Sequence, residues 1–237
     1  MNVYFLLEGK STETEVYPKW LDYLVPELTQ VSNYKDVTHN NYYLFSSNGI
    51  PSIYTDLIAA IQDINQINKY KYLVICLDAD ELTVDERISE LYENIKNEEQ
   101  LNKTKLKIIV QNRCIETWFL GNRYFYTKNP HNHQKFIEYS KFYNVYNNDP
   151  ELMKKPDTFK DTDSKFHVAY LRAMFTEKGM IEKRRLIYNK SYSKEIQKKS
   201  YLAELKKRID NTPTHLKTFT NFINFCTQLR SEISHSR

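Results

Sequence analysis

Continuous apolar runs alternate with amphipathic segments through the first half of the chain. Apolar runs that stop abruptly are typical of buried strands, and apolar positions three or four residues apart are typical of helices. The runs predict strands at 3–7, 42–47, 72–77 and 105–111. The amphipathic segments predict helices after a cap at Ser11 or Thr12, at 52–67 and at 83–100. This alternation predicts an α/β fold with a mostly parallel sheet flanked by helices.

The second half of the chain has a different pattern. After 112–122 the residues become rich in aromatic side chains, asparagine and lysine, and segments such as 165–179 and 200–209 have helical spacing. Loops are predicted near Asn129-Pro130 and at 147–156, and no further strand is predicted. We therefore expect an α/β domain at 1–125 and a mainly helical C-terminal extension at 126–237.

Composition narrows the class of protein. The chain has 237 residues and 41% apolar content, which is enough for a sizeable core. No 18-residue apolar run and no signal-peptide pattern occurs, so we expect a cytoplasmic protein that does not enter a membrane. Cys76, Cys114 and Cys226 are widely spaced and contain no CxxC pair. These spacings predict reduced, buried cysteines rather than disulfides or a zinc ribbon.

Charge is distributed unevenly along the chain. Residues 1–125 contain 12 Lys and Arg against 18 Asp and Glu, whereas residues 126–237 contain 22 against 12. A basic region can hold a polyanion through counterion release, and clustered carboxylates can hold a divalent cation. Two ordinarily solvated surfaces would give the same counts, so charge alone leaves both interpretations open.

Carboxylates follow two of the predicted strands. Glu8 ends the first strand, and Asp78 ends the third strand with Asp80 and Glu81 just beyond. The carboxyl ends of parallel strands meet at one edge of a sheet, so these groups should converge there. Their repulsion would be relieved by Mg²⁺ or Mn²⁺, which prefer oxygen ligands. Alternatively, Asp80 or Glu81 caps the helix expected near Thr83.

Three segments resemble the motifs of the TOPRIM domain, the metal-dependent fold of topoisomerases, primases and nucleases related to the OLD family. LLEGKSTETEVYPKWL resembles the first motif, and LDADE resembles the Asp-x-Asp of the second. QNRCIETWFLGN is similar to a segment of RloB-like and related small TOPRIM proteins, which occur with prokaryotic restriction and phage-defence genes. The resemblance covers about residues 1–125.

The resemblance implies roles for five carboxylates. It implies that Glu8, Asp78 and Asp80 bind metal and take part in catalysis. Glu13 matches the Thr-Glu that follows the first motif, although its spacing from Glu8 is one residue longer than in the shorter variant. Glu116 matches the glutamate of the third motif, as a ligand or, as we favour, in a supporting role. The implied chemistry is Mg²⁺- or Mn²⁺-dependent endonuclease cleavage.

The resemblance also implies a setting for this activity. The expected protein is the toxic effector of an anti-phage defence system, cutting RNA such as tRNA, or DNA. The sequence has no GxxxxGK[ST] loop, so an ATPase encoded nearby is the expected regulatory partner. A second copy of the chain is a further expected partner, as a homodimer.

Basic residues near position 190 are candidates for nucleic-acid binding. The candidates are Lys183, Arg184, Arg185, Lys190, Lys198 and Lys199. They alternate with Tyr188, Tyr192 and Tyr201, which could stack on bases. A solvated amphipathic helix with Leu202, Leu205 and Ile209 facing the core explains the same spacing.

Other interpretations remain open. A phosphatase of the HAD type also uses Asp-x-Asp after an apolar strand, but that motif normally lies near the first strand and continues with Thr or Val where this chain has Leu82. A non-catalytic interaction module with an acidic crevice is the other alternative. His131 and His133 lack a fourth zinc ligand at suitable spacing, which favours an ordinary loop. Trp118 and Phe119 are expected in the core beside Glu116.

Overall fold

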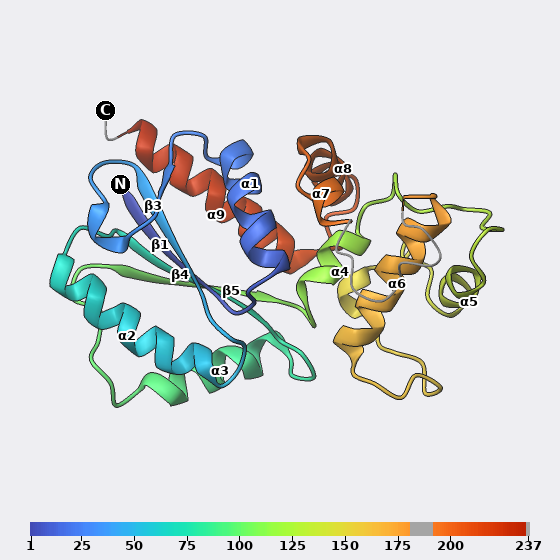
Figure 1. Cartoon of the computed structure of the whole chain (residues 1–237), viewed down its shortest axis with the longest axis horizontal. Coiled ribbons are helices and arrows are strands. Elements are labelled where there is room, and N and C mark those ends of the chain that lie inside the picture. The colour runs from blue at the N-terminus through green and yellow to red at the C-terminus, as the bar shows by residue number, and fades with distance from the viewer. Residues whose placement is uncertain (181–191, 236–237) are drawn as a thin grey trace. The chain divides into compact units, whose positions relative to one another are not determined.

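The computed structural model describes residues 1–180 and 192–235 (Figure 1). Contacts between Cα atoms divide the chain into two compact units. The first unit contains 1–78, 84–110 and 221–237, and the second contains 79–83 and 111–220. These units differ from the predicted division at residue 125, because the C-terminal residues return to the first unit.

The first unit is built on a five-stranded parallel sheet, which confirms the predicted α/β class. The strands are β1 (Asn2–Leu7), β2 (Thr29–Val31), β3 (Asn41–Ser46), β4 (Tyr72–Asp78) and β5 (Lys105–Gln111). Their order across the sheet is β2-β3-β1-β4-β5. In the register of the central pairs, Leu7 lies opposite Ser46 of β3 and Cys76 of β4. The short edge strand β2 was not predicted from the sequence.

Helices cover the two faces of this sheet (Figure 1). They are α1 (Thr12–Leu24), α2 (Ser52–Ile67), α3 (Val84–Ile95) and the part of α9 (Lys217–Ser234) that follows Thr220. Phe222 of α9 contacts Tyr17 and Trp20 of α1, with ring centroids 5.3 and 6.4 Å away. On the other face, α2 packs against α3 and β1.

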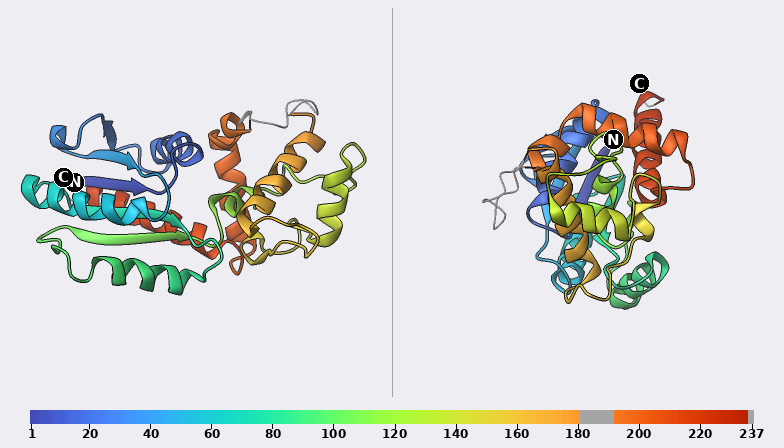
Figure 2. Two further views of the ribbon diagram at one scale, coloured as in Figure 1. Left: turned by 60° about the horizontal axis from the view of Figure 1, so that its bottom comes forward. Right: turned by 90° about the vertical axis from the view of Figure 1, so that its right-hand side faces the viewer.

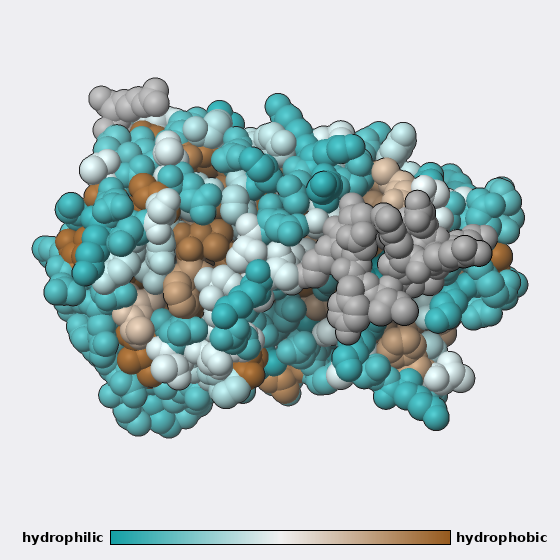
Figure 3. Space-filling view, in the orientation of Figure 1, coloured by the Kyte–Doolittle hydropathy of each residue, from teal (hydrophilic) through white to brown (hydrophobic). Residues whose placement is uncertain are grey.

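The core of the first unit is built on the continuous apolar runs of its central strands. All six residues of β1 and the first six of β4 are buried, as expected for a sheet covered on both faces. Polar residues dominate the face of the molecule drawn in Figure 3. The cap of α1 differs from the expected one: Ser11 occupies the N-cap without a side-chain hydrogen bond, and Thr14 Oγ1 donates to the carbonyls of Lys10 and Ser11.

The second unit is helical in its described residues, as predicted for the C-terminal region (Figure 2). Its helices are α4 (Ile115–Leu120), α5 (Gln134–Phe142), α6 (Asp163–Glu177), α7 (Ser193–Ile196) and α8 (Lys199–Asn211). Short 3₁₀ turns occur in the chain at Tyr34–Asp36 and Pro150–Leu152. Among the described residues, no helix combines the length and the apolar character that a membrane span requires.

Aromatic side chains fill the core of the second unit. Phe175 lies 5.1 Å from Phe125 and 6.3 Å from Tyr201 between ring centroids. Trp118 and Phe119 are fully buried, as the sequence predicted. The Trp118 indole donates a 2.7 Å hydrogen bond to Thr218, which satisfies the polar atom of this buried ring. The three cysteines are free and buried, also as predicted.

Candidate functional site

The strand order of the first unit identifies one edge of the sheet as the best candidate site. We call this edge, at the carboxyl ends of β1 and β4, the first-unit crevice. The chain proceeds from β1 to β3 on one side and then to β4 on the other, so the winding reverses between β1 and β4. Ligands of open parallel sheets bind beyond the carboxyl ends of the strands at such a reversal. Glu8 directly follows β1, and Asp78 is the last residue of β4.

A direct hydrogen bond joins these two residues. The backbone N–H of Glu8 donates to the Cys76 carbonyl at 3.0 Å, which extends the β1–β4 pairing to the end of the strands. The Oε2 atom of Glu8 then accepts the backbone N–H of Asp78 at 2.8 Å. Both side chains are partly exposed at this edge. The structure therefore brings together the two strand-end carboxylates that the sequence singled out.

Glu13 joins the same cluster from the first turn of α1. A Cβ atom placed on Gly9 would lie 2.3 Å from Glu13 Oε1, so the Glu13 carboxylate rests directly against the Gly9 backbone. Burial raises the pKa of Tyr17 well above its usual value, and the charges of Glu13 and Asp78 raise it further. Glu13 and Asp78 therefore both act on one hydroxyl group, and the longer spacing of Glu13 still allows its carboxylate to lie at the crevice.

Tyr17 and Cys76 form the buried floor beside this cluster. Burial raises the pKa of Cys76 to about 12, the hydrogen bond with Tyr17 opposes that rise, and the Glu13 charge adds to it. Cys76 is therefore a neutral thiol at physiological pH. The sequence contained a signal for Tyr17, because positions four residues apart share a helix face and Tyr17 follows Glu13 at that distance.

Serines at the end of β3 complete the crevice in the first unit. Ser46 Oγ donates to the Gly9 carbonyl at 2.9 Å, and Ser47 Oγ donates to Asp56 Oδ2 at 2.6 Å. The backbone N–H of Gly49 donates to the Glu8 carbonyl at 3.0 Å. Sequence reasoning treated these serines only as the end of a strand. Their position at the end of a strand that pairs with β1 could have predicted that they lie near Glu8 and Gly9.

Asp80 and Glu81 have other partners, within the second unit. Asp80 Oδ1 accepts the Ser164 hydroxyl at 3.0 Å, and Glu81 Oε1 accepts the backbone N–H of Asp163 at 3.1 Å. Both contacts lie at the N-terminus of α6, where carboxylates are stabilised by unsatisfied N–H groups and the helix dipole. From the sequence, Asp80 or Glu81 could instead have capped the helix that begins near Thr83. They bind instead to a helix start that is distant in sequence.

The backbone around Asp80 is held in an unusual conformation. Asp80 and Arg113 have φ values of 50° and 69°, in the left-handed region that non-glycine residues seldom adopt. Asp80 N–H donates to the Arg113 carbonyl at 2.8 Å, and Arg113 Nη1 donates to the Asp80 carbonyl at 3.0 Å. These reciprocal bonds fix the loop that follows Asp78. Such conformations are concentrated at functional sites, which adds to the interest of this segment.

Glu116 lies in the second unit, in the first turn of α4. It is buried, as is every residue of this helix. The sequence predicted no element for 112–122, and the structure shows a short helix there. Cys114 precedes it, and Cys114 Sγ lies 3.3 Å from His167 Nδ1. Burial lowers the pKa of His167 to about 4, so its imidazole is neutral at physiological pH. A catalytic or supporting role of Glu116 stays a prediction.

The predicted nucleic-acid-binding residues fall in three groups. Lys183, Arg184, Arg185 and Lys190, with Tyr188, lie outside the described residues. Lys198 and Lys199 are exposed at the start of α8. Tyr192 and Tyr201 are only 2% and 1% exposed, so the expectation that they stack on bases was wrong. Leu202, Leu205 and Ile209 share the buried face of α8 with Tyr201, which confirms the amphipathic-helix interpretation for that helix.

The two histidines near position 132 have a structural role. His133 occupies the N-cap of α5, and its Nδ1 accepts the backbone N–H of Phe136 at 3.3 Å. The backbone N–H groups of His131 and His133 donate to the carboxylate of Glu177 at 3.0 and 2.7 Å. Glu177 thereby holds the loop. This arrangement matches the ordinary loop that the spacing favoured over a zinc site.

The donor chemistry of the first-unit crevice suits a hard divalent cation. Glu8, Glu13 and Asp78 offer oxygen atoms only, which are the preferred ligands of Mg²⁺ and Mn²⁺. Within residues 1–180 and 192–235, however, no three His, Cys, Asp or Glu side chains are arranged to hold a metal ion as they stand. Mg²⁺ commonly binds through one or two carboxylates, with water and substrate phosphate as its other ligands. The residues present therefore fit Mg²⁺ better than a metal that needs a complete protein cage.

Comparison of the chain with protein-family models, with curated proteins and with solved structures finds no match in any of the three.

Proposed function

We propose that this protein is a Mg²⁺- or Mn²⁺-dependent nuclease of the TOPRIM type, which cleaves phosphodiester bonds of nucleic acid. The observation that carries the proposal is the hydrogen-bonded pair of Glu8 and Asp78 at the reversal point of a parallel sheet. Carboxylates gathered at this point, with Glu13 beside them, match the first two TOPRIM-like motifs in order. The fold class is also the one that the resemblance implies.

Glu8 and Asp78 would hold the metal, with Glu13 as a further carboxylate of the same site. A bound divalent cation polarises a phosphate and lowers the pKa of water, which provides a nucleophile at neutral pH. Without it, carboxylates this close repel one another. Asp80, two residues after Asp78, is the other metal residue that the motif implies. Its Ser164 hydrogen bond favours a positioning role instead.

Glu8 is the residue that we assign to proton transfer. Its Oε2 atom is held by the Asp78 N–H, so the carboxylate has a defined orientation at the crevice. Its other atom, Oε1, would take a proton from the attacking water. Gly9 and Ser46 line the same edge, where the hydrogen bond between them fixes the backbone that substrate would approach.

Substrate and partners belong to the same proposal. The excess of basic residues after position 125 suits a phosphate backbone, and the proposed substrate is RNA such as tRNA, or DNA. An anti-phage role, a partner ATPase encoded nearby and a homodimer also come from the resemblance. A toxic nuclease must be restrained in uninfected cells, which gives such a partner a purpose.

A non-catalytic interaction module is the second candidate function. The observation that favours it is the engagement of Asp80 and Glu81 with the start of α6. These contacts engage two of the three LDADE carboxylates in hydrogen bonds within the fold. A module of this kind would bind metal weakly or not at all and would cleave neither nucleic acid nor small phosphomonoesters.

The test combines metal binding with cleavage on one set of variants. Purified wild type, Glu8→Gln, Asp78→Asn and the control Glu15→Gln are titrated with Mn²⁺ by calorimetry and then incubated with tRNA, single-stranded RNA and DNA. Glu15 is matched because it is an exposed carboxylate on the same first turn of α1. We expect metal-dependent cleavage by wild type and Glu15→Gln only.

The same assay separates the other candidates. Hydrolysis of p-nitrophenyl phosphate without nucleic-acid cleavage would favour a HAD-type phosphatase. Because a partner can be required for activity, the variants are also expressed in cells with and without neighbouring genes, and cleaved RNA and DNA ends are sequenced. Equal toxicity of wild type and Glu8→Gln would contradict the proposal.

A further inference from the structure

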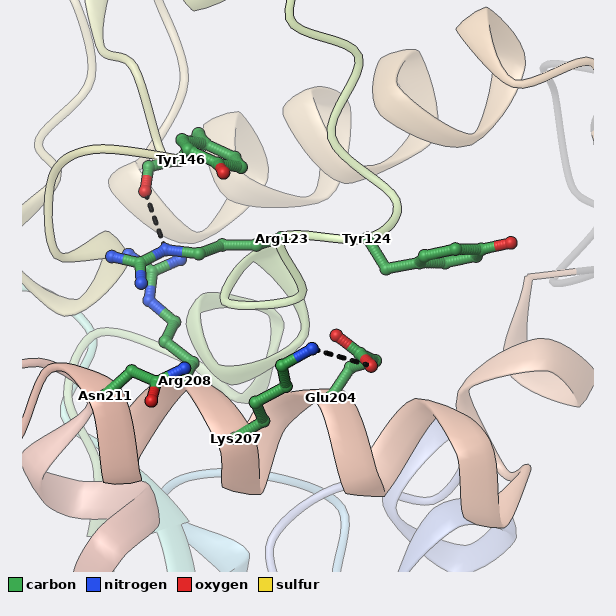
Figure 4. A pocket seen from close by; sticks show the side chains of 7 residues that line it. All are labelled: Arg123, Tyr124, Tyr146, Glu204, Lys207, Arg208 and Asn211. Atoms are coloured by element: carbon green, nitrogen blue, oxygen red, sulfur yellow. Dashed lines mark hydrogen bonds and ion pairs between the residues drawn. The ribbon is translucent and has the colours of Figure 1, made fainter.

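An open pocket lies wholly within the second unit, between the segment after α4 and the helix α8 (Figure 4). Its volume is about 300 Å³, which is within the usual range for small-ligand sites. Three cationic side chains line it, Arg123, Lys207 and Arg208. Tyr124 and Tyr146 provide aromatic rings. None of these residues belongs to the proposed nuclease site.

Arg208 contributes a buried positive charge that forms no ion pair within residues 1–180 and 192–235. Its residue is only 2% exposed, and its Nη atoms donate to the carbonyls of Gly121, Val145 and Asn148 and contact His215 Nδ1. Its Nε is buried and makes no hydrogen bond within the described part of the chain. Burial and the nearby Arg123 lower the pKa of Arg208 to about 10, so the group stays charged at physiological pH. The charge of Asp149 opposes this fall in pKa only in part, so an anion bound at the pocket would further stabilise the buried guanidinium.

Arg123 adds a second guanidinium next to that of Arg208 (Figure 4). Arg123 Nε donates to the Tyr146 carbonyl at 2.8 Å, and Nη1 donates to Thr212 Oγ1 at 3.0 Å. These bonds hold the side chain against its like-charged neighbour. Arginine presents a fork of donors that matches phosphate oxygens. Both Nη atoms of Arg208 already have partners, so Arg123 would supply the fork and Arg208 the additional positive charge.

The remaining charges around the pocket are mostly positive. Lys128 Nζ lies 4.5 Å from the centroid of the Tyr146 ring, and Arg123 lies over the same ring at 5.5 Å. Lys128 and Arg123 lower the pKa of the Tyr146 hydroxyl. The carboxylate of Glu204 lines the pocket and lies 3.8 Å from Lys207 Nζ, too far for a tight ion pair. Lys207 can therefore turn toward a ligand.

Tyr124 supplies a flat apolar surface at the edge of the pocket. Tyr124 is 70% exposed, which is unusual for a residue with a large aromatic ring. Figure 4 shows the ring projecting away from the two guanidinium groups, along the same wall. Lys178 approaches the ring to 5.8 Å. An exposed ring beside a cationic pocket is the arrangement by which proteins stack a base while holding its phosphate.

We propose that this pocket binds a nucleoside phosphate, with the phosphate against Arg123, Arg208 and Lys207 and the base on the Tyr124 ring. Two sources share this chemistry, a free mononucleotide and the 5′-phosphorylated end of a single strand. The proposal does not depend on nuclease activity, because the pocket contains none of the residues assigned to metal binding or catalysis. It places the ligand on Arg123–Tyr124 and α8.

Binding is measured by calorimetry at low salt with EDTA, so that cleavage cannot interfere. The probes are AMP, adenosine, and a single-stranded pentanucleotide with or without a 5′-phosphate. We expect saturable binding that depends on the phosphate. Tyr124→Ala and Lys207→Gln should each weaken it about fivefold or more. Tyr124→Phe, which keeps the ring, should restore the affinity. Lys206→Gln, an exposed neighbour on α8 outside the pocket, is the matched control and should bind like wild type.

The outcomes are distinguishable from one another and from failure of the nuclease proposal. Tighter binding of AMP than of the phosphorylated strand identifies a free nucleotide as the ligand, and the reverse identifies a strand end. Thermal melts verify that each variant is folded. The proposal is overturned if wild type binds neither phosphorylated probe, if adenosine binds as well as AMP, or if Lys206→Gln loses as much affinity as Lys207→Gln.

Discussion

Carboxylates in the two units are used in opposite ways. In the first unit, Glu8, Glu13 and Asp78 lie at the ends of β1 and β4 and at the start of α1. In the second unit, Glu151 and Glu177 are each surrounded by donors. Donors around a carboxylate offset the cost of burying it, whereas carboxylates placed close together repel one another. The difference identifies the first-unit cluster as the one that needs a functional explanation.

The LDADE segment contains both arrangements within five residues. Asp78 belongs to the acidic edge of the first unit, which consists of Glu8, Glu13 and Asp78. Asp80 and Glu81 instead accept hydrogen bonds at the start of α6 in the second unit. A motif of adjacent acidic residues therefore does not imply that all of them share one role. The predictions that follow separate charges kept for chemistry from charges used to hold the fold.

The largest effect is expected from Glu8→Gln. The substitution removes the charge but keeps an oxygen that can accept the Asp78 N–H. Cleavage should fall between about 100-fold and 10,000-fold, the usual range for loss of a general base. The melting temperature without metal should hold or rise, because a repelling charge is removed. Cleavage of tRNA and a thermal melt in EDTA are the two measurements.

Glu15→Gln is the control for this prediction, since it changes the same charge on the exposed side of α1. A Glu8→Gln protein that melts several degrees lower would make Glu8 a structural residue. One that melts normally and still cuts would remove it from the mechanism.

A pH-dependent loss of stability is expected from Glu151 in the second unit. Burial raises the pKa of Glu151 to about 7, although hydrogen bonds from Thr218 and Phe219 oppose the shift. Below pH 4.5 this group is protonated in both the folded and unfolded chains. As pH rises toward 7, only the unfolded chain ionises, so wild type loses stability relative to Glu151→Gln, by up to about 3 kcal/mol.

The measurement is the free energy of unfolding in urea for both proteins at pH 4.5, 6 and 7.5. The difference between them should change across this range and then level off above pH 7. A difference that is the same at all three values would show that Glu151 is ionised in the fold. Its Thr218 and Phe219 hydrogen bonds would then outweigh burial.

A somewhat smaller effect is expected from Glu177→Ala. The buried carboxylate accepts backbone N–H groups of residues 131–133, which would lose their acceptor. We expect about 2 kcal/mol of destabilisation, reduced by the access of water to this loop, and no change in Mn²⁺ affinity. The exposed Glu138→Ala is the control. A stability like that of wild type would mean that water replaces the carboxylate at little cost.

The sequence predicted most of the first unit, and its failures have physical causes. The helix at 52–67 and the strand at 105–111 match α2 and β5, because period and apolar content are strong signals in such segments. The strand β2 is only three residues long and lies at the sheet edge, so its exposed Thr29 and Gln30 carry no burial pattern. The helix α4 is buried on all sides, so it has no polar face that periodicity could reveal.

The candidate site was predictable only where it depends on strand ends. Glu8 and Asp78 meet because parallel strands end together, which is a general property of the fold. The partners of Asp80 and Glu81 are about 80 residues away, and no local pattern points to the start of α6. Tyr192 and Tyr201 were misassigned because a tyrosine among lysines can equally face inward, and only packing decides this.

Comparison of Asp78→Asn with Asp80→Asn tests directly whether the two aspartates of LDADE have different roles. Asparagine keeps an acceptor oxygen and tolerates the left-handed backbone of Asp80, so both variants should fold. We expect Asp78→Asn to weaken Mn²⁺ binding about tenfold or more, as for lost metal-site groups, and Asp80→Asn to have less effect. Calorimetry decides between them. Equal losses would make Asp80 a ligand, as the motif implies, and would contradict a purely positioning role.

The smallest effect is expected from Gly9→Ala, which tests the place of Glu13 in the acidic edge. Gly9 does not have a positive φ, so alanine fits its backbone. The new Cβ would instead meet Glu13 Oε1 at 2.3 Å and displace this flexible carboxylate. Stability should be unchanged or about 0.5 kcal/mol higher, since alanine restricts the unfolded chain. Mn²⁺ affinity should fall a few-fold, because the substitution moves a negative charge that attracts the cation out of the site.

A double-mutant cycle assigns this loss to Glu13. If Gly9→Ala acts by displacing the carboxylate, it should have no further effect on Mn²⁺ affinity in a Glu13→Gln background, since the charge is already absent. Additive losses would show that Gly9 is needed for another reason, such as close approach of the metal or phosphate to its backbone. An unchanged affinity in Gly9→Ala alone would place Glu13 outside the metal site and leave Glu8 and Asp78 as its only first-unit carboxylates.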